Sequence, residues 1–200
     1  INKDFWMTNC MPKMLEPPEK VRIPLMDEAG IDIQVLSPNS PGIQGILDPV
    51  EAVEAAIRIN DSLYDFARKY PDRFLCFASL PLQNPQAAAD ELERCVTKLG
   101  FKGAIVHGHT NFHYLDERQF DCVWAKAEEL DVPISLHVID PALDQIKIYE
   151  GCYELLGPAW NWNVENATHI LRMVCNGVFK RFPKAKLIAG HMGEGLPYYL

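Results

Sequence analysis

Short apolar runs and longer amphipathic stretches alternate along this chain from about residue 31 onward. Each run holds four to six residues, a length typical of buried parallel strands. The runs predict strands at 31–36, 74–78, 103–106, 133–137 and 186–189. Apolar residues at helical spacing precede each run and predict helices at about 19–29, 48–66, 84–99, 116–130 and 164–182. Residues 1–20 have no clear periodicity and predict an irregular loop that leads into the first helix.

Local signals support several of these helix boundaries. Asp48 precedes Pro49, and Asn84 precedes Pro85, which is the expected order of an N-cap residue and the first helical residue. Gly30 suits the position just beyond the end of a helix.

The order of the elements predicts the fold class. Strands that alternate with helices indicate an α/β protein with a parallel sheet and right-handed crossovers. A (β/α)8 TIM-type barrel and an open doubly wound sheet both fit, but no glycine-rich dinucleotide fingerprint follows any strand, which favours the barrel. A complete barrel takes about 250 residues. We therefore expect residues 1–200 to form one domain that covers only the middle of a barrel, about five βα units.

Composition and charge exclude several partners. Apolar residues make up 48% of the chain and charged residues 23%, as in ordinary globular proteins. The net charge of −8 argues against a nucleic-acid partner. No apolar run approaches the roughly 18 residues of a membrane span, so we expect no membrane partner. The N-terminus shows no signal-peptide pattern, and because the chain does not begin with Met, we expect its beginning to be missing.

The six cysteines are spread along the chain without a C-x-x-C pair. This spacing favours buried thiols in a reducing compartment over a disulfide framework or a zinc knuckle. We therefore expect a cytoplasmic location.

The last sixteen residues contain the clearest candidate chemistry. Gly190 ends the strand at 186–189, and His191 and Glu194 follow in a loop rich in glycine. Because active sites of parallel α/β proteins lie at the carboxyl ends of the strands, this imidazole and this carboxylate are candidate catalytic residues. A glycine-rich turn that happens to hold two polar residues is the alternative.

His137 ends the strand at 133–137 and is a candidate metal ligand. Both His137 and His191 would point from strand ends into the same mouth, and histidines in this position hold divalent metals together with a carboxylate. A core histidine that is hydrogen-bonded to backbone remains open for His137.

Two further groups of ring-bearing side chains lie in predicted loops. His107, His109 and His113 follow the strand at 103–106, where they either line the mouth or supply an H-x-H metal site. Trp160 and Trp162 lie in the long loop after His137. They either wall an aromatic substrate site or plug the loop onto the barrel.

Four segments together resemble the non-oxidative aromatic-acid decarboxylases of the amidohydrolase superfamily, which include gamma-resorcylate and 2,3-dihydroxybenzoate decarboxylases. They are P-D-R-F-L-C-F-A-S-L-P-L-Q-N-P at 71–85, L-D-V-P-I-S-L-H at 130–137, I-Y-E-G-C-Y-E-L-L-G-P-A-W at 148–160 and G-H-M-G-E-G-L-P at 190–197. The resemblance runs from about Val21 to Leu200.

This resemblance implies a metal-dependent amidohydrolase-type barrel that binds one divalent metal ion, zinc or manganese. It implies that His137 is a metal ligand and that His191 and Glu194 are the catalytic pair. Of the two tryptophans in the long loop, Trp160 is the candidate substrate contact. The implied reaction is non-oxidative decarboxylation of an ortho-hydroxybenzoate such as 2,3-dihydroxybenzoate or gamma-resorcylate, which releases CO2. The family also implies a homodimer or homotetramer.

The chain departs from the family pattern at three points. No E-x-H or H-x-H motif precedes residue 30, and we expect the family's aspartate ligand to lie beyond Leu200. Where relatives often have H-P-R, this chain has His137, Val138 and Ile139, which alters the mouth beside the metal. A metal-dependent hydrolase of a lactone or ester, and a protein that keeps the fold without the metal site, are the alternative functions.

Overall fold

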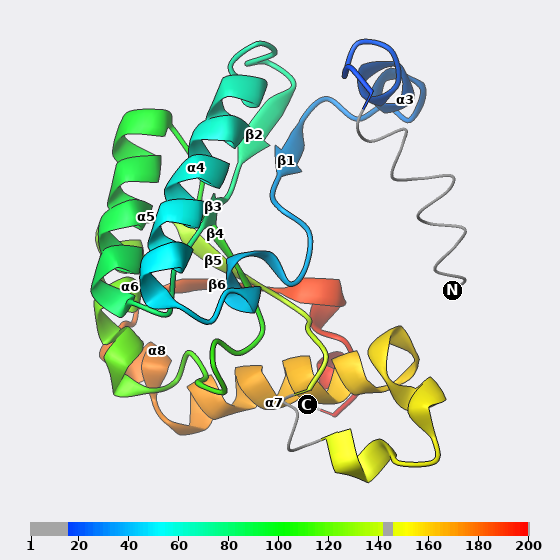
Figure 1. Ribbon diagram of the computed structural model, residues 1–200, viewed down its shortest axis with the longest axis vertical. Helices are drawn as coiled ribbons and strands as arrows, with labels where there is room; N and C mark the ends of the chain where they lie inside the picture. Colours follow the sequence, from blue (N-terminus) through cyan, green and yellow to red (C-terminus); the bar gives the residue numbers. More distant parts are fainter. Residues whose placement is uncertain (1–15, 142–145, 200) are drawn as a thin grey trace.

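The computed structural model describes residues 16–141 and 146–199 (Figure 1). The loop predicted for residues 1–20 therefore lies mostly outside the described residues, as does Cys10. Strand β1 (Gln34–Leu36) pairs with β2 (Phe74–Cys76). A second sheet has the order β3 (Ala78–Ser79), β4 (Ala104–His107), β5 (Pro133–His137) and β6 (Lys186–Ala189). Every pair is parallel, and within each sheet the strands lie in the order of the sequence, as the predicted barrel requires.

The predicted strand at 74–78 is divided between the two sheets. Its first half, β2, pairs with β1, and its second half, β3, pairs with β4. Between them, the Phe77 amide donates to the Leu36 carbonyl at 3.0 Å, and the Ala78 amide donates to the Gly103 carbonyl at 2.8 Å. The division therefore marks the point at which one extended segment changes its hydrogen-bonding partner.

Helices α4 (Pro49–Ala67), α5 (Pro85–Leu99) and α6 (Asp121–Glu129) lie together on one side of the sheet (Figure 1). The predicted caps of the first two are confirmed. Asp48 accepts hydrogen bonds from the Val50 and Glu51 amides, both at 2.9 Å, and Asn84 accepts one from the Ala87 amide at 3.2 Å. These bonds satisfy amides that a helix start otherwise leaves without partners.

Other helix boundaries differ from the prediction. Helix α3 is Arg22–Glu28, and the helix expected from 116 begins as the 3-10 helix η3 (Arg118–Phe120) before α6. The helix expected at 164–182 is two helices, α7 (Asn161–Cys175) and α8 (Val178–Arg181), because Gly177 adopts a left-handed conformation with φ of 70°.

Short 3-10 helices fill the loops at the carboxyl ends of the strands, and α9 follows the last of them. The 3-10 helices are η2 (Gly42–Gly45), η4 (Ile146–Tyr149), η5 (Tyr153–Leu155), η6 (Gly157–Ala159) and η7 (Gly190–Gly193). The α-helix α9 is Leu196–Tyr199. Helix α7 crosses the molecule below the sheet in Figure 1 and so lies close to these strand ends.

The core lies between the strands and helices α4 to α6. Ala104, Val106, Ile134 and Leu136 from the two central strands have no solvent exposure, and Trp124 of α6 is equally buried. In β5, where buried and partly exposed positions alternate, a shift by one residue would turn Ile134 and Leu136 away from this core, so their burial fixes the register of the strand.

A buried polar network ties α4 to β3 and α5. The Asn60 amide group donates to the Ser79 carbonyl at 3.0 Å and to the Glu91 carboxylate at 2.7 Å, and its oxygen accepts from the Ser79 amide at 2.9 Å. Arg94 forms a two-pronged ion pair with Glu91. The Asn60 amide and the Glu91 carboxylate are therefore both paired, as buried polar groups must be.

All five described cysteines have free thiols, as predicted. Cys76 and Cys95 are buried, and burial raises the pKa of Cys76 to about 11. The expectation of burial is wrong for Cys175, which is exposed at the end of α7, and Cys152 is exposed as well. Within residues 16–141 and 146–199, none of the helices has the length and apolar character needed to span a membrane.

Candidate active site at the strand ends

Four aromatic rings form a row along the carboxyl ends of β4, β5 and β6. His107 and His137 end neighbouring strands and lie opposite each other in register. Their ring centroids are 5.1 Å apart, the His137 and His191 centroids are also 5.1 Å apart, and the ring of Trp162 lies 5.5 Å from that of His191. Each contact is edge-on, which is a favourable arrangement for aromatic rings. The structure thus places His137 and His191 together, as the sequence predicted.

His137 has the tautomer that a metal ligand requires. Its Nδ1 lies 2.9 Å from the Val138 carbonyl oxygen, which can only accept a hydrogen bond. Nδ1 therefore carries the hydrogen, and Nε2 keeps its lone pair. Burial lowers the pKa of His137, so the ring favours the neutral form that binds metal.

His107 is a packed imidazole deep in the same row. Burial, with a smaller contribution from His137, lowers the pKa of His107 to about 4. Gly42 of η2 lies against its ring, and an added Cβ at this glycine would come within 2.8 Å of Nδ1. His107 thus ends strand β4 as a neutral side chain and does not begin a loop.

His191 and Glu194 form an ion-pair contact of 2.9 Å between Nδ1 and Oε1. The backbone between them is unusual: His191, Met192 and Glu194 all have positive φ, at 49°, 57° and 53°. Residues other than glycine rarely adopt such φ values, because this backbone conformation is strained for them. Strained residues of this kind cluster at functional sites. The carboxylate fixes the imidazole so that Nε2 is directed away from Glu194.

Gly190 allows this loop to pass close to β5. An added Cβ there would come closer than 3.0 Å to the backbone oxygen of Leu136. Because that oxygen belongs to the backbone of a central strand, it cannot move aside cheaply. The first glycine of G-H-M-G-E-G is therefore required by close packing between backbones.

Helix α7 supplies three side chains that hold this loop. Asn166 donates its amide to the Gly190 carbonyl at 3.1 Å, and the oxygen of Asn163 accepts from the Gly195 amide at 2.6 Å. Trp162, whose ring lies on His191, donates its indole N–H to Asp140 at 2.9 Å. Sequence reasoning missed both asparagines, although the spacing in N-W-N-V-E-N puts them on the same face of a helix.

Trp160 remains a predicted substrate contact. Its side chain is 46% exposed just before α7, whereas Trp162 is the tryptophan in contact with His191. The predicted helix start at about 164 left both tryptophans in the loop, whereas α7 begins at Asn161 and so contains Trp162 but not Trp160.

The H-x-H segment does not form a metal site in the described part of the chain. His113 pairs with Glu117 at 2.7 Å on an exposed loop, and the ring of His109 is stacked near Phe112, with centroids 5.7 Å apart. Across residues 16–141 and 146–199, no three metal-ligating side chains gather closely enough to hold an ion. Among these residues, His137 has the chemistry of a metal ligand, since its Nε2 keeps a lone pair.

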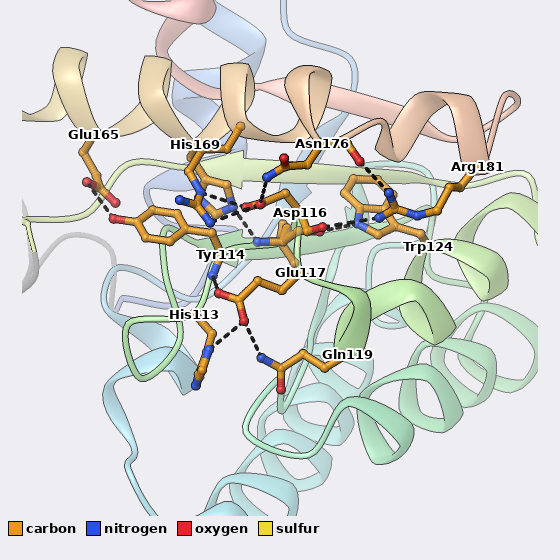
Figure 2. A network of polar contacts seen from close by, with 12 residues as sticks. His113, Tyr114, Asp116, Glu117, Gln119, Trp124, Glu165, His169, Asn176 and Arg181 are labelled. Carbon is orange, nitrogen blue, oxygen red and sulfur yellow. Dashed lines mark hydrogen bonds and ion pairs between the residues drawn. The ribbon is translucent and has the colours of Figure 1, made fainter.

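A second polar network fixes α7 itself (Figure 2). The buried ring of His169 accepts a hydrogen bond from the Leu115 amide at 2.9 Å, and burial lowers the pKa of His169 to about 3. Arg172 forms two bonds to Asp116, at 2.9 and 3.1 Å, and Asn176 adds a third. The segment between β4 and α6 thereby holds the helix that in turn contacts the loop of His191.

Comparison with known proteins gives matches over most of the chain. Residues 16–199 match the family model described as "Amidohydrolase". Gamma-resorcylate decarboxylase from Rhizobium sp. (strain MTP-10005) is 45% identical over 188 residues, which cover 91% of this chain and 58% of the relative. The chain therefore spans somewhat more than half the length of this curated relative.

Solved structures are equally similar. A dihydroxybenzoic acid decarboxylase from Polaromonas sp. JS666, with bound manganese and the inhibitor 2-nitroresorcinol, is 43% identical with a TM-score of 0.93. The match covers 99% of this chain and 61% of that protein. A 2,6-dihydroxybenzoate decarboxylase in complex with 2,6-dihydroxybenzoate has the same identity and TM-score, and the match covers 99% of this chain and 62% of that protein.

Proposed function

We propose that this chain, which belongs to the amidohydrolase family, carries the catalytic pair of a metal-dependent decarboxylase that acts on ortho-hydroxybenzoates. The observation that carries this proposal is the row of rings in which His191, paired with Glu194, lies against His137. The proposed acid–base residue and the proposed metal ligand thus lie side by side at the strand ends, where barrel enzymes have their active sites.

The metal's role follows from the donor that the chain offers. His137 would bind the ion through Nε2, since its Nδ1 is engaged with the Val138 carbonyl. When bound, a divalent ion such as manganese or zinc would act as a Lewis acid toward the substrate's carboxylate and the neighbouring phenolic oxygen. This role agrees with the manganese in the similar Polaromonas protein.

His191 would supply the proton for the reaction. The proton moves from Nε2 of the charged imidazole to the ring carbon that bears the carboxylate. The bond between this carbon and the carboxylate then breaks, its electron pair restores the aromatic ring, and CO2 leaves. Glu194 accepts a hydrogen bond from Nδ1–H and so orients the His191 ring.

The substrate class is supported by the relatives and by the aromatic wall. Trp162, packed on His191, offers an apolar face to a benzoate ring, and Trp160 is the further predicted contact. The similar proteins act on gamma-resorcylate, or 2,6-dihydroxybenzoate, which favours this compound over 2,3-dihydroxybenzoate. The relatives named above are all decarboxylases, which favours decarboxylation over hydrolysis of a lactone or ester.

We also propose a homodimer or homotetramer in the cytoplasm. The free thiols support a reducing compartment. Light scattering coupled to size-exclusion chromatography measures the oligomeric state, and cell fractionation measures the location.

The test is metal content and CO2 release, measured on the natural gene product with a panel of ortho-hydroxybenzoates. We expect about one metal per chain and CO2 release from gamma-resorcylate. His191→Ala should abolish release, and Glu194→Gln should reduce kcat. His113→Ala, which removes only an exposed ion pair with Glu117, is the matched control and should leave the rate unchanged. Bound metal without CO2 release from any of these compounds would contradict the proposal and favour the hydrolase.

A further inference from the structure

The loop from Gly190 to Gly195 has little support of its own. Three of its residues have positive φ without being glycine. Its bonds to itself and to α9 include Glu194 N–H to the His191 carbonyl and Tyr198 N–H to the Gly195 carbonyl, both at 3.0 Å. A strained backbone of this kind persists only where the surroundings hold it in place.

The first turns of α7 provide that external support at both ends of the loop. Asn166 binds the Gly190 carbonyl immediately before His191, and Asn163 binds the Gly195 amide immediately after Glu194. The asparagines are three residues apart and so lie on one face of the helix. The two bonds thus bracket the His191–Glu194 pair.

We propose that Asn163 and Asn166 are positioning residues that hold the His191–Glu194 pair in its working geometry. The inference rests on the proposed function in one respect, namely that this pair is catalytic. Neither asparagine bonds to His191 or Glu194 through its side chain, so their effect is on placement of the pair.

The two asparagines hold the loop with opposite chemistry. A backbone amide can only donate, so Asn163 must present its oxygen to Gly195, and a carbonyl can only accept, so Asn166 must present its nitrogen to Gly190. The same isosteric change therefore has different consequences. Asn163→Asp keeps the acceptor, whereas Asn166→Asp replaces the donor with a carboxylate that faces a carbonyl oxygen.

The burial of the two side chains adds to this difference. Asn166 is only 2% exposed, whereas Asn163 is partly exposed. An aspartate at 166 would thus be a buried charge with no hydrogen-bond donor facing it, which is costly. Thermal unfolding must therefore check that the Asn166→Asp variant is folded. Asn166→Ala provides a second variant without that charge.

The experiment compares these variants with Asn176→Ala, a control at the far end of the same helix. Asn176 also makes one side-chain bond, to Asp116, but it does not touch the loop. We would measure kcat and KM for gamma-resorcylate, and amide hydrogen exchange of the segment from Gly190 to Gly195. The exchange measurement reports the loop's support whether or not the protein turns over substrate.

We expect Asn163→Ala and Asn166→Ala to lower kcat by about 100-fold, the size of loss that a 1 Å misplacement of reacting groups causes. KM should stay near the wild-type value, and exchange in the segment should become faster. Compared with the alanine variants, Asn163→Asp should return kcat to near the wild-type value and hydrogen exchange to the slow wild-type rate. Asn166→Asp should do neither. Asn176→Ala should lower thermal stability alone.

Unchanged exchange and unchanged kcat in both alanine variants would overturn the inference. An equal loss of kcat in Asn176→Ala would also overturn it, since the effect would then follow from general weakening of α7. If the wild-type protein releases no CO2, the proposed function fails, and faster exchange in the alanine variants at 163 and 166, but not at 176, would still support the positioning role.

Discussion

Replacement of Gly190 by alanine tests whether the catalytic loop needs its close approach to β5. The added Cβ would overlap the Leu136 oxygen, and since ordinary contact begins at 3.4 Å, the two must move apart by about 1 Å. Leu136 is fully buried and pairs with Ala189, so the loop is the part that moves. His191 directly follows Gly190 and moves with it.

We expect this displacement to lower kcat by about 10- to 100-fold, because a 1 Å error in placing reacting groups costs about 100-fold. The stability loss should be about 1–3 kcal/mol, as is usual when an extra carbon is forced into a packed site. The assay is CO2 release at saturating gamma-resorcylate, with urea unfolding of the same samples.

Gly30→Ala is a matched control. The positive φ of 67° at Gly30 strains an alanine there, a penalty that does not apply at Gly190, but nothing lies within 4 Å of the added Cβ, and Gly30 is far from the ring row in the sequence. It should cost about 1–2 kcal/mol of stability without a change in kcat. Retention of wild-type kcat by Gly190→Ala, with unfolding showing that the protein is folded, would refute the reasoning.

Three further changes probe the metal, the core and the pH response. His137→Ala should lower bound metal, measured by elemental analysis, and wild-type metal content would contradict the assigned ligand. Asn60→Ala removes three buried hydrogen bonds and should cost about 3–5 kcal/mol in urea unfolding, whereas the exposed control Gln86→Ala should cost almost nothing. The pKa of His169 is lowered to about 3 in the folded protein, whereas a histidine of the unfolded chain has a pKa of about 6.5. As the pH falls, the unfolded chain therefore binds a proton at a higher pH than the folded protein does, so stability should fall below about pH 6.5. His169→Gln should reduce this fall, and an unchanged pH slope would contradict the assignment.

The sequence predicted the strands and capped helices because their signals are local. Asp48 and Asn84 each need only the next few amides, and the apolar runs need only a buried position. The change of partner at Phe77 depends on where Leu36 and Gly103 lie, which no local pattern encodes.

The candidate site shows the same limit. His137, His191 and Glu194 could be predicted because they follow apolar runs at strand ends. Trp162 and the two asparagines of α7 act through contacts with residues 24 to 32 positions away, such as Gly190 and Gly195. Helical spacing shows that such side chains share a face, but not what that face meets.

The strand order has a consequence for contacts between molecules. Within the part of the chain that the structure describes, β1 pairs only with β2, and β6 pairs only with β5, so each has one edge without a strand beside it. Val35 and Ile188 on these strands are 47% and 43% exposed. Open edges with exposed apolar side chains accept further strands from other molecules. These two edges are therefore where we expect a strand of another molecule to add, and Lys186, the charged residue on β6, opposes such addition.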